Sequence, residues 1–197
     1  MNCIPKTVAL PLAFLCLAGA ADSQPRLAFE GLGPVRIGMS ETELKKIGFS
    51  DPYRSSDWQT DDEYPACHYL ANEEDYPGVG LMINDNRLVR IDVGAKAASA
   101  KWQTLSGATI GMTETEIAAI YGSWMKMDYH PYLGDSGSYL TLQSGDGRYR
   151  MIFETATPDG SGEAFVSSPS RGPNSRKRVT DFRAGLAEPV GYIEGCS

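Results

Sequence analysis

Residues 38–48 read Gly-Met-Ser-Glu-Thr-Glu-Leu-Lys-Lys-Ile-Gly, and residues 111–122 read Gly-Met-Thr-Glu-Thr-Glu-Ile-Ala-Ala-Ile-Tyr-Gly. The second stretch repeats the first, with one residue inserted before its final glycine. A unit that occurs twice in one chain is information about architecture, because tandem copies of a small structural unit pack against each other. We therefore expect two similar halves.

Each stretch contains the signals that begin and end a short helix. Ser40 and Thr113 are typical N-cap residues, and Glu43 and Glu116 stand three positions later, which completes a capping box in both copies. A glycine, which tolerates positive φ, ends each helix. Both predicted helices have only about two turns, so packing against the rest of the protein must hold them in place.

Segments with alternating apolar residues follow each helix and predict antiparallel strands. A short extended piece also precedes each helix. The predicted strands are 66–70, 79–83 and 88–93 in the first half and 139–143, 149–154 and 178–183 in the second, with extended pieces at 35–37 and 108–110.

The fold class that we expect from this pattern is α+β. It consists of two tandem repeats, each a short helix packed on a three- to four-stranded antiparallel sheet. The expected boundaries are 1–21 for a signal peptide, 22–103 for the first repeat and 104–197 for the second, with the C-terminal segment bridged to the first.

The N-terminal residues indicate export. Lys6 precedes a short apolar run, and small residues at 18–20 suit cleavage near Ala20 or Ala21. The run is too short to span a bilayer, and we expect no stable membrane insertion elsewhere. Periplasmic or secreted localisation follows from this reading.

The charge balance is acidic. The whole chain has a formal net charge of −7, and removal of Lys6 with the signal peptide makes it −8. This balance argues against nucleic acid and anionic membrane as partners and suits a basic protein partner. Ordinary solubility of an exported protein explains it as well.

Two cysteines remain after export, Cys67 and Cys196. An even number in an exported chain predicts a disulfide, here one that ties the first half to the C-terminus. A reactive or metal-binding thiol is the alternative, but the two residues are far apart in the sequence and no Cys-x-x-Cys motif accompanies them.

The sequence carries no recognisable catalytic set. It lacks the nucleophile-elbow, phosphate-loop and dinucleotide-binding motifs. The two histidines, His68 and His130, occupy different places in their repeats, so they do not form a repeated metal-ligand pair. We therefore expect no enzyme activity, no cofactor and no metal site.

Binding residues are expected where the two halves differ. Residues 49–78 interleave aromatic and acidic side chains, a combination that provides anchors and steering charges for a protein partner. A second tyrosine-rich stretch lies at 128–139. The candidate binding residues are Trp58, Asp61, Asp62, Glu63, Tyr64, Tyr129 and Tyr132.

The helix-start motif, followed by antiparallel strands, resembles the repeat unit of beta-lactamase inhibitor proteins. It is also similar to the single-copy unit of small outer-membrane lipoproteins that assist barrel assembly. Two copies in one exported chain favour the inhibitor type, which implies a concave sheet that grips a partner protein without catalysis. The C-terminal residues 192–197 look like the end of uncharacterised exported bacterial proteins.

The function that we expect is therefore non-enzymatic binding to another envelope or secreted protein, with inhibition as one consequence. Two alternatives stay open. One is a protein that binds carbohydrate or cell-wall glycan through exposed Trp58, Tyr129, Tyr132 and Tyr139, since aromatic rings stack on sugars. The other is an accessory factor in envelope assembly.

Overall fold

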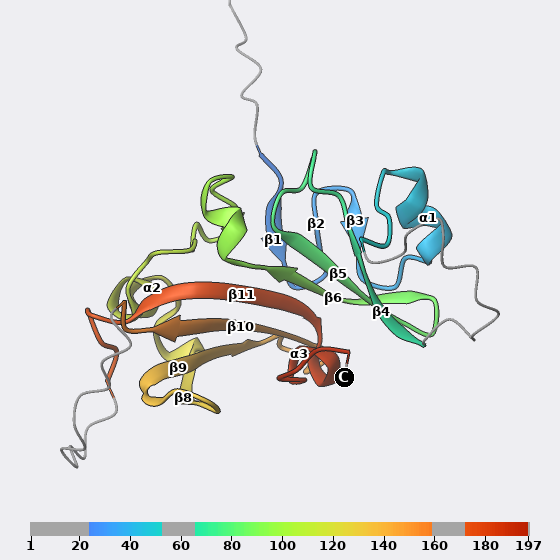
Figure 1. Ribbon diagram of the computed structural model, residues 1–197. Coiled ribbons are helices and arrows are strands. Elements are labelled where there is room, and N and C mark those ends of the chain that lie inside the picture. The colour runs from blue at the N-terminus through green and yellow to red at the C-terminus, as the bar shows by residue number, and fades with distance from the viewer. Residues whose placement is uncertain (1–23, 53–65, 159–171, 197) are drawn as a thin grey trace, which may run out of the picture.

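The fold is taken from a computed structural model that describes residues 24–52, 66–158 and 172–196 (Figure 1). The elements are mostly strands, with short helices between them. In chain order they are β1 (Arg26–Ala28), β2 (Gly31–Leu32), β3 (Val35–Arg36), α1 (Glu41–Lys46), β4 (Cys67–Ala71), β5 (Val79–Asn84), β6 (Arg87–Val93), η1 (Ala95–Ala98), β7 (Gln103–Thr104), α2 (Glu114–Tyr121), η2 (Gly122–Trp124), β8 (Lys126–His130), β9 (Gly134–Gln143), β10 (Tyr149–Ala156), β11 (Arg178–Leu186) and α3 (Ala187–Val190).

Seven strands form one antiparallel sheet, in the order β4-β5-β6-β11-β10-β9-β8. Its centre is the pair of β6 and β11, which lie far apart in the sequence. In that pair Asp92 lies opposite Arg183, and Ile91 lies opposite Ala184. This single contact between strands joins the three strands of the first half to the four strands of the second half (Figure 1).

A smaller sheet packs beside the large one. Its order is β3-β2-β1-β7, with β1 antiparallel to β2 and parallel to β7. The main core lies between the small sheet, the two longer helices and one face of the large sheet. Its fully buried side chains come from all of these elements and include Leu27, Leu32, Leu44, Ile91, Ile117, Phe153 and Phe182.

The opposite face of the large sheet carries charged and tyrosine side chains. Successive residues of a strand point to opposite faces, so the residues between the core positions of the central strands share this second face. We call it the polar face and define it by Tyr69, Arg90, Asp92, Tyr139, Glu154 and Arg183.

Both predicted helices and both capping boxes are confirmed. Ser40 accepts a hydrogen bond from the backbone N–H of Glu43, whose carboxylate accepts from the backbone N–H of Ser40, and Thr113 and Glu116 do the same. Each cap also pairs with the start of a later strand, Ser40 with Arg87 and Thr113 with the corresponding arginine of β11. The local repeat therefore includes the way in which each helix is anchored to the large sheet.

The expected fold class is wrong in its most important point. The protein is mostly β, and only α2 reaches seven residues among the helices of the described segments. The halves do not form two separate helix-on-sheet repeats, because their strands share one continuous sheet. The physical reason is edge pairing: β6 and β11 would each expose a row of unpaired backbone groups in a separate sheet, and joining them satisfies both rows.

The predicted strands occur close to the expected positions, but β8 of the large sheet and β1, β2 and β7 of the small sheet were missed. β8 reads Lys-Met-Asp-Tyr-His, and it lies at the edge of the sheet with most of its side chains at least partly exposed. A strand of this kind lacks the apolar alternation that a buried face imposes. β9 also begins five residues before the predicted 139–143.

The predicted disulfide is confirmed between Cys67 and Cys196, which are separated by 129 positions. The bridge is consistent with an oxidising compartment. No helix in the described segments is long and apolar enough to cross a bilayer. The predicted signal peptide, residues 1–21, lies outside the described residues.

Candidate functional site

Two buried arginines organise the polar face. Arg90 and Arg183 come from the neighbouring strands β6 and β11, and each is only 5% exposed. Arg90 pairs with Asp92 through Nε at 2.9 Å, and Arg183 pairs with Glu154 through Nη1. Buried charges need such partners, because water is no longer available to solvate them.

The C-terminal residues 187–196, which we call the tail, cross above these arginines. Arg90 Nη1 donates to the carbonyls of Pro189 at 3.0 Å and Tyr192 at 2.7 Å. Arg183 Nε donates to the carbonyl of Val190 at 2.7 Å. The tail thus replaces water around both guanidinium groups, and the disulfide at Cys196 attaches its end to β4.

Tyrosine rings complete the same face. Tyr69 Oη accepts a hydrogen bond from Arg90 Nη2 at 2.8 Å, and burial together with the charge of Asp92 raises the pKa of this tyrosine to about 12. On the other side, the guanidinium carbon of Arg183 lies 5.2 Å from the centre of the Tyr139 ring. That distance fits a cation–π contact.

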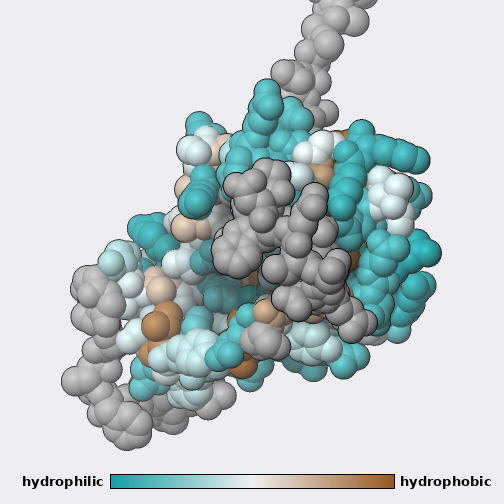
Figure 2. Space-filling model, turned by 45° about the vertical axis from the view of Figure 1, so that its right-hand side comes forward, coloured by the Kyte–Doolittle hydropathy of each residue, from teal (hydrophilic) through white to brown (hydrophobic). Residues whose placement is uncertain are grey.

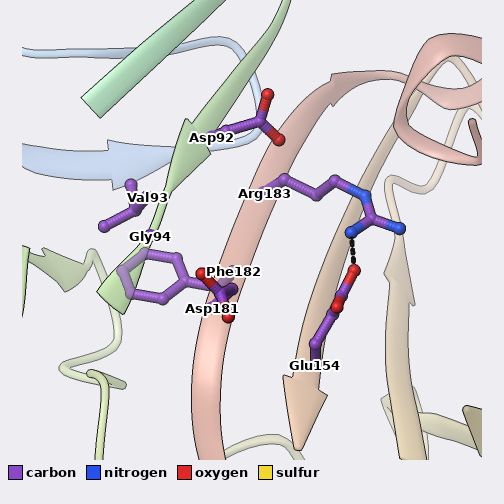
Figure 3. Close-up of a pocket in the computed structure, with 7 residues that line it drawn as sticks. All are labelled: Asp92, Val93, Gly94, Glu154, Asp181, Phe182 and Arg183. Atoms are coloured by element: carbon purple, nitrogen blue, oxygen red, sulfur yellow. Dashed lines mark hydrogen bonds and ion pairs between the residues drawn. The ribbon is translucent and has the colours of Figure 1, made fainter. Parts of the chain in front are cut away.

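A shallow pocket of about 200 Å³ opens between β6, β10 and β11 (Figure 3). Asp92, Glu154 and Asp181 line it together with Arg183. Burial raises the pKa values of Asp92 and Asp181 above the ordinary value. Burial would raise the pKa of Glu154 too, but the charge and hydrogen bond of Arg183 outweigh it and hold that pKa below its usual range.

The pocket carboxylates already have partners within the protein. Asp92 binds Arg90, Glu154 binds Arg183 (Figure 3), and Asp181 Oδ1 accepts from the backbone N–H of Ala95 at 3.1 Å. The described residues contain no group of three or more His, Cys, Asp or Glu side chains that could hold a metal ion. This arrangement fits an ion-pair network that holds the centre of the sheet together.

His130 is part of this network at the edge of the sheet. Its Nε2 lies 3.3 Å from Glu154 Oε2, and its ring meets the Tyr139 ring edge-on with 4.9 Å between centres. Its Nδ1 accepts hydrogen bonds from the backbone N–H groups of Tyr132 at 3.1 Å and Leu133 at 3.3 Å. The histidine therefore holds the turn between β8 and β9.

That turn and the tail together expose a group of large hydrophobic side chains. Tyr132 is 64% exposed, Leu133 43%, Tyr192 39% and Ile193 44%. The two segments touch where the Tyr132 hydroxyl donates to Glu194. We call these four residues the tyrosine patch. The face shown in Figure 2 is largely hydrophilic where it is coloured, with scattered hydrophobic residues.

The sequence-predicted binding residues divide into two groups. Tyr129, at 48%, and Tyr132 are exposed, as a binding role requires. Tyr139 is only 9% exposed beneath the arginine network, so the expectation of an exposed Tyr139 ring for glycan stacking is wrong. Five predicted residues, Trp58, Asp61, Asp62, Glu63 and Tyr64, lie outside the described residues.

The sequence did not predict the roles of Arg90 and Arg183, the contact of His130 with the turn, or the position of the tail. One signal was present: Arg90, Asp92 and Arg183 interrupt apolar strands at positions that alternate with core residues. Charges at such positions indicate a sheet face that must be neutralised by something placed above it. No comparable signal marked Tyr192 and Ile193, because a terminal segment has no periodicity that shows where it lies.

Comparisons with known proteins add no relative. A scan against models of known protein families finds no match, and searches of curated proteins and of solved structures find none either.

Proposed function

We propose that this protein is an exported, non-enzymatic binding protein and that the tyrosine patch contacts its partner, another exported or envelope protein. The observation that supports this most is the clustering of exposed large hydrophobic residues. Of the seven such residues in the described segments, Leu105 and Trp124 lie elsewhere, and the other five belong to β8, its turn to β9, or the tail. Tyrosine is enriched in protein–protein interfaces, and contiguous exposed hydrophobic residues mark interaction sites.

The patch is ordered before any partner arrives. The Tyr132 hydroxyl is held by Glu194, and the Tyr192 hydroxyl donates to Glu188 at 3.1 Å. These hydrogen bonds raise the pKa of both tyrosines, so both hydroxyls keep their protons at neutral pH. A side chain that is already held in place loses less conformational entropy on binding, which favours affinity.

The buried arginines of the polar face and the disulfide also hold the tail in place. Arg90 and Arg183 donate to three of its carbonyls, and the disulfide fixes its end. The carboxylates of Glu188 and Glu194 border the patch, so a partner with basic residues around an apolar contact fits it best. The predicted signal peptide together with the disulfide supports a periplasmic or secreted location.

Site-specific photo-crosslinking tests this proposal. A photoreactive phenylalanine analogue is placed at Tyr132 or at Ile193, and the exported protein is irradiated in its native host. Leu105 provides a matched control, because it is 64% exposed like Tyr132 but belongs to the loop after β7. We expect one discrete protein adduct from both patch positions and none from position 105.

Two results would contradict the proposal. One is the absence of any discrete adduct at both patch positions, and the other is the same set of adducts at all three positions. Purified partner then allows the affinity to be measured with Tyr132→Ala and with Leu105→Ala, of which only the first should weaken binding.

A further inference from the structure

His130 Nδ1 accepts two hydrogen bonds from the turn that carries half of the tyrosine patch. Two backbone N–H groups, those of Tyr132 and Leu133, point at this one nitrogen at 3.1 and 3.3 Å. An amide N–H can only donate, so Nδ1 must carry no proton. The ring proton therefore resides on Nε2, which faces the Glu154 carboxylate at 3.3 Å. The structure thus assigns the tautomer of this histidine.

We propose that His130 is the positioning residue of the tyrosine patch and that its protonation opens the patch, which makes the patch pH-dependent. This inference rests on the proposed function, because it concerns the regulation of the same surface. An imidazolium has N–H groups on both nitrogens and accepts no hydrogen bond. A proton on Nδ1 would face two amide N–H groups, so both hydrogen bonds of the turn would be lost.

The turn has little room to adjust without opening. A side-chain carbon on Gly137, which lies under the turn, would come within 2.8 Å of His130 Cβ and 3.0 Å of Leu133 Cβ. The backbone of β9 is therefore in close contact with the turn and blocks movement toward β9, so we expect the turn to move outward when its hydrogen bonds are lost. Such a movement carries Tyr132 away from Glu194, the contact that joins the turn to the tail.

Charged and polar groups from three neighbouring segments face His130. From β10 the Glu154 carboxylate faces Nε2, and Arg183 of β11 is bound to the same carboxylate. From β9 the neutral Tyr139 presents its ring, and from the turn Tyr132 and its neighbour present the two N–H groups that oppose a second ring proton. A proton on Nδ1 and the two hydrogen bonds of the turn therefore exclude each other.

Two variants separate this histidine from everything else that titrates between pH 8 and pH 5, where histidine is the side chain that normally changes charge. His130→Asn places an amide oxygen close to the position of Nδ1, where it accepts from both N–H groups at every pH. The chain contains only one other histidine, His68, so His68→Gln leaves His130 as its only histidine.

The experiment is a pH titration followed by amide and imidazole ¹⁵N NMR on the exported protein and both variants. In the wild type and in His68→Gln, we expect Nε2–H imidazole signals at pH 8. We also expect the Tyr132 and Leu133 amide signals to shift together along one transition on acidification. In His130→Asn those two amides should not show this transition.

Three results would overturn the proposal: an Nδ1–H tautomer at pH 8, protonation of His130 while both amides stay unchanged, or the same amide transition in His130→Asn. None of these measurements needs a partner. If crosslinking fails and the amides titrate as expected, the binding function is wrong and the switch stands. If crosslinking succeeds and the amides do not respond, the binding function stands and the pH switch is wrong.

Discussion

Removal of the disulfide should destabilise this protein strongly, although one of its two cysteines, Cys196, lies in the short tail. The double variant Cys67→Ala/Cys196→Ala eliminates a cross-link over 129 positions. In the chain-entropy model a closed loop of that length stabilises the folded state by about 5 kcal/mol at 25 °C. Since domains are typically stable by about 5–15 kcal/mol, the variant loses a large part of the total.

The assay is urea unfolding of both proteins, followed by circular dichroism. The unfolding free energy should fall by several kcal/mol. The dependence of that free energy on urea concentration should become steeper, because an unfolded chain without the cross-link exposes more surface. Alkylation without reductant, followed by intact mass measurement, should find no free thiol in the wild type.

The folded state keeps other attachments for the tail. The buried Arg90 and Arg183 still donate to its carbonyls in the double variant. We therefore expect the tail to remain on the sheet and the loss to arise mainly in the unfolded state. A loss below about 1 kcal/mol with an unchanged urea dependence would refute this reasoning, as would two alkylated cysteines in the wild type.

Three further outcomes follow from the core and the polar face. Phe153→Ala removes a fully buried ring and should lower the unfolding free energy by about 3–5 kcal/mol in urea unfolding. Gly185→Ala would place a carbon 2.3 Å from the carbonyl oxygen of Val89, so it should cost more than about 1 kcal/mol, and a smaller loss in the same assay would contradict the β6–β11 register. The folded-state pKa of Glu154 is lowered by Arg183, so its contribution is present above the unfolded pKa of about 4.3 and is lost as the pH falls through the folded value. The stability difference between wild type and Glu154→Gln should therefore shrink on acidification below about pH 5, and a constant difference would argue against the ion pair.

Local features of the fold could be read from the sequence because their causes are local. Ser40 with Glu43 and Thr113 with Glu116 form the expected capping boxes, since a cap depends on residues three positions apart. The strands of the central hairpins follow from alternation in the same way. The cysteine pair was predictable by count, because only Cys67 and Cys196 lie outside the predicted signal peptide.

The candidate site was less predictable, because it depends on contacts between distant segments. Tyr132 was expected to bind a partner, but the residue that its hydroxyl contacts, Glu194, lies 62 positions further along the chain. His130 was considered only as a possible metal ligand, and nothing in the sequence indicated that its ring would accept hydrogen bonds from the N–H groups of the following turn.

The sequence by itself determined the two capped helices, the approximate strands of the large sheet and the disulfide pair. The tertiary structure alone decided that β6 pairs with β11, that the tail crosses two buried arginines, and that the tyrosines of turn and tail meet. The physical reason is that a strand pattern specifies which side of a strand faces the core but not which strand lies beside it. Which strands pair depends on burial and edge pairing over the whole chain. The two halves share one sheet because the edge strand of each pairs the exposed backbone groups of the other.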